Sequence, residues 1–403
     1  MHKIERLLQT LAPKGVEFRK LGEVCEILDN RRIPIAKNKR NPGIYPYYGA
    51  NGIQDYIDSY IFDGDFVLVG EDGSVINKDN TPVVNWASGK IWVNNHAHVL
   101  QTKNELKLKF LYFYLQTIDV SYCVAGTPPK INQENLKKIT IPIPPLEIQQ
   151  EIVKILDAFT ELNTELNTEL NARKKQYQYY QNMLLDFNDI NSNHKDAKMS
   201  AKPYPKRLKT LLQTLAPKGV EFRKLGEVCD FQKGKSITKK AVTLGKVPVI
   251  SGGRQPAYYH NEANRSGETI AISSSGVYAG YVSYWDIPVF LADSFSVSPK
   301  QKTLMPKYLF HYLTTQQDAI HATKSTGGIP HVYSKDLQNF LIPIPPLEVQ
   351  QEIVKILDQF SLLTTDLLAG IPAEIKARKK QYEYYREKLL TFKPLTPHKE
   401  VKK

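Results

Sequence analysis

The chain has 403 residues, of which 54 are Lys or Arg and 41 are Asp or Glu, so its formal net charge at pH 7 is +13. No run of about eighteen apolar residues occurs, which excludes an ordinary membrane-spanning helix. This basic balance favours a polyanionic partner, either nucleic acid or an acidic membrane surface; the alternative is a solvated basic surface without a specific ligand.

The cysteines and the N-terminus indicate the compartment. Cys25, Cys123 and Cys229 have no C-x-x-C spacing, and two of them occupy equivalent places in a repeat. They predict buried thiols in a reducing cytoplasm and exclude a disulfide framework or a zinc site. The N-terminal stretch MHKIERLLQTLAPKG is too polar for a secretory signal, so we expect a cytoplasmic protein.

A nearly identical frame occurs twice along the chain. The segment LLQTLAPKGVEFRKLGEVC stands at Leu7–Cys25 and again, unchanged, at Leu211–Cys229. The segment PIPPLEIQQEIVKILDAF at Pro142–Phe159 returns almost unchanged at Pro343–Phe360. A fixed period of this kind indicates two copies of one structural unit.

The frame surrounds two dissimilar middles, Glu26–Ile141 and Asp230–Ile342. Both alternate short β-branched or aromatic runs with Gly, Asn, Asp and Pro, which predicts strands and tight turns. One helix is expected near the end of each, around Lys109–Thr117 and Lys307–Thr315. Each middle is therefore predicted to be a mixed α/β domain whose loops have diverged on a shared scaffold.

A long helix is expected after each middle. Apolar residues recur at steps of three and four over 148–184 and again over 349–389, the pattern of a heptad seam. Both segments follow a Pro-Pro pair, and Pro is well tolerated at a helix start. We expect the two helices to bury their stripes against each other, unless each stripe lies on its own domain.

The first helix contains a tandem repeat, TELNTELNTELN, at Thr160–Asn171. Four residues lengthen a helix by about 6 Å and turn its face by about 40°, so the number of copies can change while the seam survives. On B-DNA that length corresponds to about two base pairs. In the second helix, Gly370 and Pro372 predict a kink or a break.

No motif for chemistry is found. The chain has no glycine-rich cofactor fingerprint and no methyltransferase motif, and the pair His96 and His98 in NNHAH is more typical of a polar strand or loop than of a metal site. We expect no catalytic residue, metal or cofactor in this chain.

The polar and basic loops of the middles are candidates for DNA contact. Lys and Arg contact phosphates, whereas Asn, Gln, Arg, Ser and Asp can read base edges. Any one of these residues could simply lie in an exposed turn, but two clustered sets on duplicated domains favour DNA. The candidates are Arg31, Arg32, Lys37, Lys39, Arg40, Asn51, Ser74, Asn94, Asn95, His96 and Lys130 in the first middle, and Lys233, Lys235, Lys239, Lys240, Ser251, Arg254, Ser274, Ser275, Asp293, Ser294, Lys324 and His331 in the second.

Two domains, each followed by IPIPPLE-[IV]-QQEIV-x-ILD and a long helix, resemble the specificity subunit of type I restriction-modification systems. The resemblance covers essentially the whole chain. It implies two target-recognition domains, each reading one half of a bipartite site in double-stranded DNA, and two antiparallel spacer helices related by a pseudo-two-fold axis. Two methyltransferase subunits would bring S-adenosylmethionine, and restriction subunits would bring ATP and magnesium. It also implies that Leu7–Cys25 completes a near-circular arrangement with the end of the chain.

The expected fold class is α+β, with two mixed recognition domains joined by a pair of long helices. The expected boundaries are a first recognition domain at 1–141, a spacer helix at 142–190, a linker at 191–206, a second recognition domain at 207–342, a second spacer helix at 343–392 and a disordered tail at 393–403. The residues expected to dock the partner or to form the spacer are Leu146, Gln149, Ile152, Phe159, Leu347, Gln350, Ile353 and Phe360.

Two alternatives remain at this point. The chain could serve a compact system in which one partner both cuts and methylates DNA. It could instead be a coiled-coil adaptor whose side domains bind protein.

Overall fold

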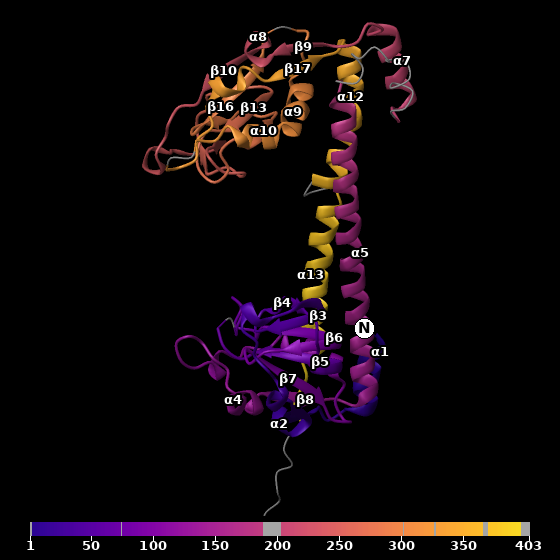
Figure 1. Ribbon diagram of the computed structural model, residues 1–403. Helices are drawn as coiled ribbons and strands as arrows, with labels where there is room; N and C mark the ends of the chain where they lie inside the picture. Colours follow the sequence, from indigo (N-terminus) through magenta and orange to yellow (C-terminus); the bar gives the residue numbers. More distant parts are fainter. Residues whose placement is uncertain are drawn as a thin grey trace, which may run out of the picture. The chain divides into compact units, whose positions relative to one another are not determined.

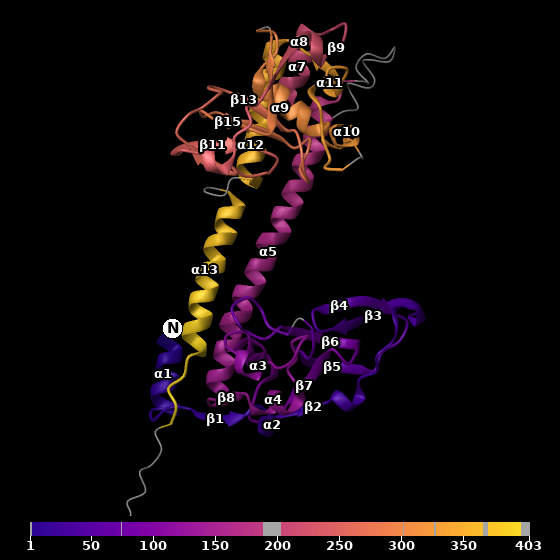
Figure 2. The same cartoon turned by 90° about the vertical axis from the view of Figure 1, so that its left-hand side faces the viewer.

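The computed structural model describes residues 2–73, 75–187, 203–300, 302–325, 328–365 and 370–395 (Figures 1 and 2). The chain divides into two compact units. Unit 1 consists of Met1–Asn167 and Glu374–Lys403, and unit 2 consists of Thr168–Ala373. Each unit contains one mixed domain and parts of both helical regions. Among the described residues, no helix combines the length and apolar character that a membrane span requires.

Unit 1 is built around one six-stranded sheet with the order β2-β7-β5-β6-β3-β4. Its strands are β2 (Cys25–Ile27), β3 (Pro42–Gly49), β4 (Gly52–Ile57), β5 (Phe62–Gly70), β6 (Val84–Val93) and β7 (Ala97–Thr102), and β1 (Glu17–Lys20) pairs separately with β8 (Thr140–Ile143). The helices are α1 (His2–Leu11), α2 (Leu21–Val24), α3 (Leu108–Leu115) and α4 (Gln133–Lys138). Helix α3 covers one face of the sheet at β5, β6 and β7. The end of β5, Phe66–Gly70, is buried throughout, as expected for an apolar run in a central strand.

Unit 2 repeats this plan with a divided sheet. Its strands are β10 (Cys229–Lys233), β16 (Ser294–Pro299), β13 (Thr269–Ser273) and β14 (Val282–Trp285) in one sheet, β12 (Tyr258–His260), β11 (Leu244–Ile250) and β15 (Phe290–Leu291) in a second, and β17 (Leu341–Ile344) and β9 (Glu221–Lys224) in a third. The helices are α7 (Lys206–Leu215), α8 (Leu225–Val228), α9 (Pro306–Thr315), α10 (Gln317–Ala322) and α11 (Ser334–Leu337). Where unit 1 has the single strand β6, unit 2 has β14 and β15, with Pro288 between them. Proline cannot donate to a ladder, which accounts for the interruption. The fold class is α+β, as predicted.

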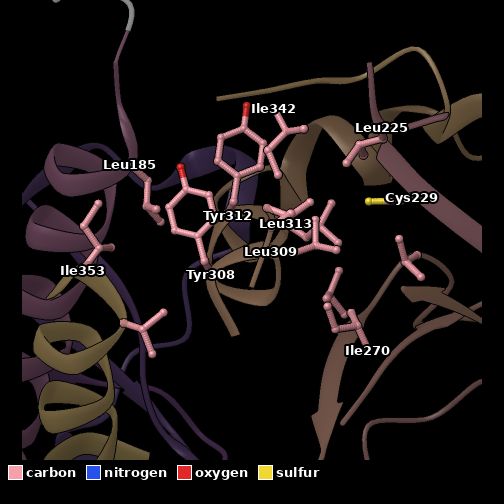
Figure 3. Close-up of a cluster of buried hydrophobic side chains, with 14 of the residues drawn as sticks. Leu185, Leu225, Cys229, Ile270, Tyr308, Leu309, Tyr312, Leu313, Ile342 and Ile353 are labelled. Carbon is pink, nitrogen blue, oxygen red and sulfur yellow. The ribbon is translucent and has the colours of Figure 1, made fainter. Parts of the chain in front are cut away.

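Helix α9 organises the core of unit 2 (Figure 3). Four of its side chains pack between the helix that carries the buried Ile353 and the strands of the domain: Tyr308, Leu309, Tyr312 and Leu313. The two tyrosine hydroxyls donate to backbone carbonyls of β17: Tyr308 Oη to Pro343 O at 3.1 Å and Tyr312 Oη to Leu341 O at 2.7 Å. Burial therefore leaves neither hydroxyl without a partner.

All three cysteines are free and buried, as predicted. Burial raises the pKa of the Cys25 thiol and that of the Cys229 thiol to about 12. A thiol that stays protonated is a poor nucleophile and a poor metal ligand. These residues therefore act as small apolar side chains.

The long helices begin where the sequence predicts. Helix α5 (Leu146–Leu185) is continuous for 40 residues and includes all three TELN copies. The other helical region is described as α12 (Leu347–Thr365) and α13 (Ile371–Leu390), in agreement with the kink or break expected near Gly370. Pro372 falls in the first turn of α13, where its missing N–H needs no helical partner.

Each apolar stripe packs on its own domain in one segment and against the other helical region in another, so both expectations are confirmed. In unit 1, Ile148 and Ile152 are fully buried in the core of their own domain, which also takes in Leu389 and Leu390 of α13. Further along α5, the Phe159 ring packs on Tyr385 of α13 at a centroid distance of 5.6 Å.

Unit 2 has the same arrangement. Its core combines Val349 and Ile353 of α12 with Leu184 of α5, and the Tyr180 ring packs on Phe360 at 5.1 Å. Each spacer helix therefore starts on its own domain and continues against the other helical region.

A segment near the N-terminus pairs with a segment near the C-terminus within unit 1. Val16 N donates to Lys393 O at 2.8 Å, Leu395 N donates to Val16 O at 3.0 Å, and Val16 and Pro394 form a parallel bridge. The first three residues of the predicted tail 393–403 therefore belong to the fold, which corrects that boundary; residues 396–403 lie outside the described part of the chain.

The predicted linker 191–206 also needs a correction at its end. Tyr204 is buried in the core of unit 2, and Lys206 is the first residue of α7. Tyr204 packs in the core of the domain that follows it, and Lys206 begins a helix of that domain, so both belong to the domain and not to the linker. The remainder of the predicted linker, up to residue 202, lies outside the described residues.

Candidate nucleic-acid interface

In both mixed domains, three loops meet at one end of the central strands. In unit 1 they follow β5, precede β7 and precede α4, and Glu71 holds them together. Its N–H donates to His96 O at 2.8 Å, and its carbonyl accepts from Ile131 N at 2.8 Å. Gly73 N donates to Pro129 O at 3.0 Å, which closes the set.

Unit 2 makes the same three backbone bonds. Ser274 N donates to Asp293 O at 3.1 Å, Val332 N donates to Ser274 O at 2.9 Å, and Gly276 N donates to Pro330 O at 3.0 Å. The loops that the sequence marks as divergent therefore share one backbone frame. We call this set of bonded loops the loop frame.

The side chains that stand on the loop frame differ between the units. In unit 1, His96 Nδ1 contacts Asp72 Oδ1. At the matching place in unit 2, Ser275 Oγ donates to Asp293 Oδ2. The isolated bridges Asp72–Lys130 and Ser275–His331 bring Lys130 or His331 alongside each pair. One backbone arrangement thus presents different donors and acceptors.

Not every candidate residue is available on this surface. Arg32 has only 10% of its side chain exposed, and its Nη1 lies 2.6 Å from Glu71 Oε2 and 2.8 Å from Ala97 O. Asn94 is buried, and its Oδ1 accepts from His96 N. Ser294 is buried, and its Oγ donates to Ile250 O. The prediction that Arg32, Asn94 and Ser294 contact DNA is therefore wrong, because each is used inside the domain.

Arg32 belongs to a buried ionic cluster with Asp29, Glu71 and His98. The ring nitrogens of His98 face Asp29 Oδ2 at 2.6 Å and Ile131 O at 2.7 Å, and Lys130 Nζ lies 3.1 Å from Glu71 Oε1. Burial by itself would raise the pKa of the Asp29 carboxyl, but the hydrogen bond and charge of His98 and the charge of Arg32 lower it.

Asp29, Glu71 and His98 are close enough to one another to ligate a metal ion. However, the Arg32 guanidinium already faces both carboxylates, and both nitrogens of His98 already have protein partners. Charges that are paired in this way hold the loops in place, and this ion pairing competes with any metal ion for the same carboxylates.

Several candidate cations remain exposed. Lys37 and Lys39 lie in a short 3₁₀ turn, η2 (Lys37–Lys39), ahead of β3, and Lys239 and Lys240 lie in the matching turn, η5 (Lys239–Ala241), ahead of β11. Lys233, Lys235 and Arg254 are exposed as well. Each unit therefore carries a basic turn at the same point of its fold, which suits phosphate contact.

The remaining candidates differ in their surroundings. Arg31 packs over Phe62 at 4.7 Å, and Arg40 packs over Tyr47 at 4.1 Å and pairs with Asp55. The exposed or half-buried others are Asn51, Asn95, His96, Lys130, Ser251, Ser274, Ser275, Asp293, Lys324 and His331. Ser74 lies outside the described residues.

The residues predicted to dock a partner divide into buried and exposed sets. Gln149 Nε2 donates to Pro144 O at 2.7 Å and Glu105 O at 2.9 Å, and its Oε1 accepts from Lys107 N at 2.8 Å. Gln350 makes the same bonds to Pro345 O, Thr303 O and Met305 N.

These two glutamines, like Ile152 and Ile353, are fully buried, so they do not dock a partner. They lie in the long helices α5 and α12, in agreement with the spacer role that was the other expectation for them. Phe159 and Phe360 pack between helices. Leu146 and Leu347, each 42% exposed, remain on the surface.

A second duplicated contact escaped the sequence analysis. Lys109 Nζ lies 3.4 Å from Asp157 of α5 and 4.5 Å from the Trp86 ring centroid. In unit 2, Lys307 Nζ lies 2.7 Å from Asp358 of α12. Each pair joins a mixed domain to its spacer helix, and the matching positions of lysine and aspartate in the two copies were the available signal.

The comparisons with known proteins agree with the duplicated plan. Residues 13–176 and 217–377 match the family described as Type I restriction modification DNA specificity domain. A putative type I restriction enzyme specificity subunit of Haemophilus influenzae is 36% identical over 402 residues, covering 96% of this chain and 98% of the relative. The EcoR124I/EcoR124II specificity subunit of Escherichia coli is 29% identical over 431 residues, covering 98% of each chain.

A solved structure shares the fold. The type I restriction-modification S subunit from M. genitalium has a TM-score of 0.64 at 20% sequence identity, and the match covers 93% of this chain and 96% of that one. At this identity the likeness concerns the fold alone.

Proposed function

The chain belongs to the type I restriction modification DNA specificity family, and we propose that each of its mixed domains reads one half of a bipartite DNA site. The observation that carries this proposal is the loop frame, in which the same backbone bonds recur in both units under different side chains. Two loop frames with the same backbone bonds but different donors and acceptors suit two different half-sites, since base edges are distinguished by their donor and acceptor patterns.

The excess of positive charge supports contact with the DNA backbone. The chain carries a net charge of +13, and both basic turns, η2 and η5, are exposed. Lysines at such turns would contact phosphates and set the register of each domain on the duplex, while the loop frames carry the sequence preference.

The sequence segments that recur around both mixed domains support two copies of one protein partner. Leu11 and Leu146 in unit 1, and Leu215 and Leu347 in unit 2, occupy equivalent positions, and each is 42% exposed. Leu215 and Leu347 line one groove in unit 2. We propose that these leucines dock two methyltransferase subunits.

Under this proposal the chain has no catalytic residue of its own. The methyltransferase subunits would bring S-adenosylmethionine, and the restriction subunits would bring ATP and magnesium. The spacer helices would set the gap between the two half-sites, with the TELN copies as the adjustable length.

The alternatives gain no support. The relatives described above are specificity subunits of type I enzymes, which speaks against a coiled-coil adaptor and against a compact system with one fused partner.

A domain replacement tests the proposal. Residues 26–141 are replaced by a second copy of residues 230–342, which is possible because the frame Leu7–Cys25 is identical to Leu211–Cys229. The chimera and its methyltransferase partner are expressed in a host, and methylated sites are mapped across the genome. We expect a site made of two copies of the second half-site in opposite orientation.

The reciprocal chimera, with two copies of residues 26–141, is the matched control and should give the first half-site twice. Retention of the original bipartite site by either chimera would contradict the proposal that each domain reads one half.

A further inference from the structure

The loop Ser251–Ala257 of unit 2 leaves its sheet at the point where the turn at Asn51 leaves the sheet of unit 1. Ile250 O, at the end of β11, accepts from Ala292 N at 2.8 Å, and Tyr48 O, near the end of β3, accepts from Asn94 N at 3.0 Å. Both loops therefore begin beside the segment that supplies the loop frame with Asp293 or His96.

The loop of unit 2 is held tightly against the loop frame. A Cβ added at Gly252 would lie 2.5 Å from Ser275 O and 3.6 Å from Asp293 Oδ2. Only glycine fits so close to the neighbouring backbone. Arg254 follows two residues further on in the same loop.

Two tyrosines of the loop frame hold the guanidinium of Arg254. Its Cζ lies 5.0 Å from the Tyr278 ring centroid and 5.5 Å from the Tyr281 ring centroid. A guanidinium that packs on an aromatic ring uses its face for that contact and keeps the N–H donors at its edge. The rings therefore orient Arg254 and leave its donors available for a ligand.

Arg254 differs in this respect from the other arginines of unit 2 that the structure describes. It is exposed, and its side chain has no ion pair or hydrogen bond to a protein acceptor among the described residues. The others face protein acceptors: Arg173 lies 3.5 Å from Glu169, Arg207 lies 3.1 Å from Glu352, Arg223 lies 3.6 Å from Glu227, and Arg265 Nη2 donates to Lys233 O at 3.1 Å.

Lys324 is a second cation near His321. The pKa of His321 is lowered, first by burial and then by the charges of Lys324 and Arg254, with Asp318 opposing them. Two neighbouring positive side chains favour the approach of a polyanion. An arginine that contacts two aromatic rings and keeps its N–H donors unpaired is suited to a base edge within DNA.

We propose that Arg254 reads a guanine in the major groove of the half-site bound by unit 2. Guanine presents O6 and N7 side by side there, and a guanidinium edge binds both at once. The inference rests on the proposed function, because it assigns one base contact within the half-site that unit 2 would read. Asn51, at the equivalent turn of unit 1, has an amide in place of the guanidinium, so the two turns should read different bases.

The test uses the full chain in complex with its methyltransferase partner, after methylation mapping has defined both half-sites. Each guanine of the second half-site is replaced in turn by 7-deazaguanine, which lacks N7 but still pairs with cytosine. Equilibrium binding to these duplexes is measured by fluorescence anisotropy. One substitution should weaken binding by roughly two- to tenfold, because it removes one of the two acceptors of a good bidentate contact.

Variants at Arg254 show whether that loss belongs to this side chain. Arg254→Ala should bind unmodified DNA at least as weakly as the wild-type complex binds the critical 7-deazaguanine duplex, because it loses the contact to O6 as well as that to N7, and should respond no further to the base change. Arg254→Lys keeps the charge and loses the planar fork, so its affinity should fall nearly as far. Thermal unfolding of each variant confirms that the domain remains folded, and analogues in the first half-site serve as the control.

Three results would overturn the inference: a second half-site without guanine, an Arg254→Ala complex that still responds to 7-deazaguanine as the wild type does, or an Arg254→Lys complex with full affinity and selectivity. The last would identify a phosphate contact, for which charge alone suffices. Binding that ignores the sequence of both half-sites would instead refute the proposed function itself.

Discussion

Removal of one TELN copy from α5 should shorten the gap between the half-sites and leave both half-sites unchanged. The variant deletes Thr164–Asn167 and joins Asn163 to Thr168, so the remaining copies keep their order. The local structure repeats with the same period. Thr160 Oγ1 donates to Leu156 O at 2.9 Å, and Thr164 Oγ1 donates to Thr160 O at 2.9 Å.

The size of the effect comes from helix geometry. Four residues of α-helix span about 6 Å and amount to one turn with about 40° of excess rotation. Leu162 and Leu170, both half-buried, become four residues apart, so the apolar face of α5 is preserved. At about 3.4 Å per base pair, the gap should contract by about two base pairs.

The assay is methylation mapping of a host that carries the variant chain and its methyltransferase partner. A chain with a fourth TELN copy should widen the gap by the same amount, which makes the test two-sided. The length-matched control replaces Thr164 and Asn167 by Ala and should leave the gap as it is. A gap that stays constant through both deletion and insertion, or half-sites that change with either, would refute the role of α5 as a spacer.

Four further outcomes are expected. The complex should lose DNA affinity steeply with salt. The double variant Lys37→Ala, Lys39→Ala should reduce the slope of log K against log salt by about 1.8, which corresponds to two phosphate contacts. An unchanged slope would place these lysines away from DNA. Gln149→Ala and Gln350→Ala each remove a side chain that makes three hydrogen bonds to the backbone, and each should lower the free energy of unfolding by about 2–4 kcal/mol in urea titrations. The control Gln150→Ala, at an exposed neighbouring position, should have little effect. Gly15→Ala places a Cβ 2.6 Å from Lys393 O at a residue with φ of +110°, and should lower stability by about 1–3 kcal/mol in thermal unfolding, with Gly253→Ala as the control. The hydrogen bond from His311, with help from Lys307, lowers the pKa of the Asp358 carboxyl below its ordinary value. Asp358→Asn should therefore destabilise the protein at pH 7, and the difference should shrink as the pH falls through the depressed folded-state pKa; a difference independent of pH would show that the charge is not involved.

The sequence by itself predicted the features that depend on local order. The duplicated frame, the mixed character of each middle and the helix starts after the Pro-Pro pairs all follow from neighbouring residues and from periodicity. The break near Pro372 has a local cause as well, since a missing N–H and a fixed φ act on the adjacent turn. For these features, the repeated residues and their spacing are sufficient.

The candidate site was only partly accessible in this way. The composition of the loops identified the right regions, because loops of both domains are rich in Lys, Asn, Ser and Gly. It could not separate Arg32 from Arg31, which stand side by side in the sequence. One pairs with the buried Glu71, and the other packs over Phe62. Whether a charged side chain serves the fold or a ligand depends on which distant acceptor it meets.

Only the tertiary structure decided the contacts between segments far apart in the chain. Val16 meets Lys393, Gln149 bonds to the loop ahead of α3, and Arg254 rests on Tyr278. Such contacts arise when the two sides bury a common surface and satisfy each other's polar groups, and neither side carries a local pattern that names the other. The sequence thus determined the repeating scaffold, and long-range packing determined which side chains remain free to read a ligand.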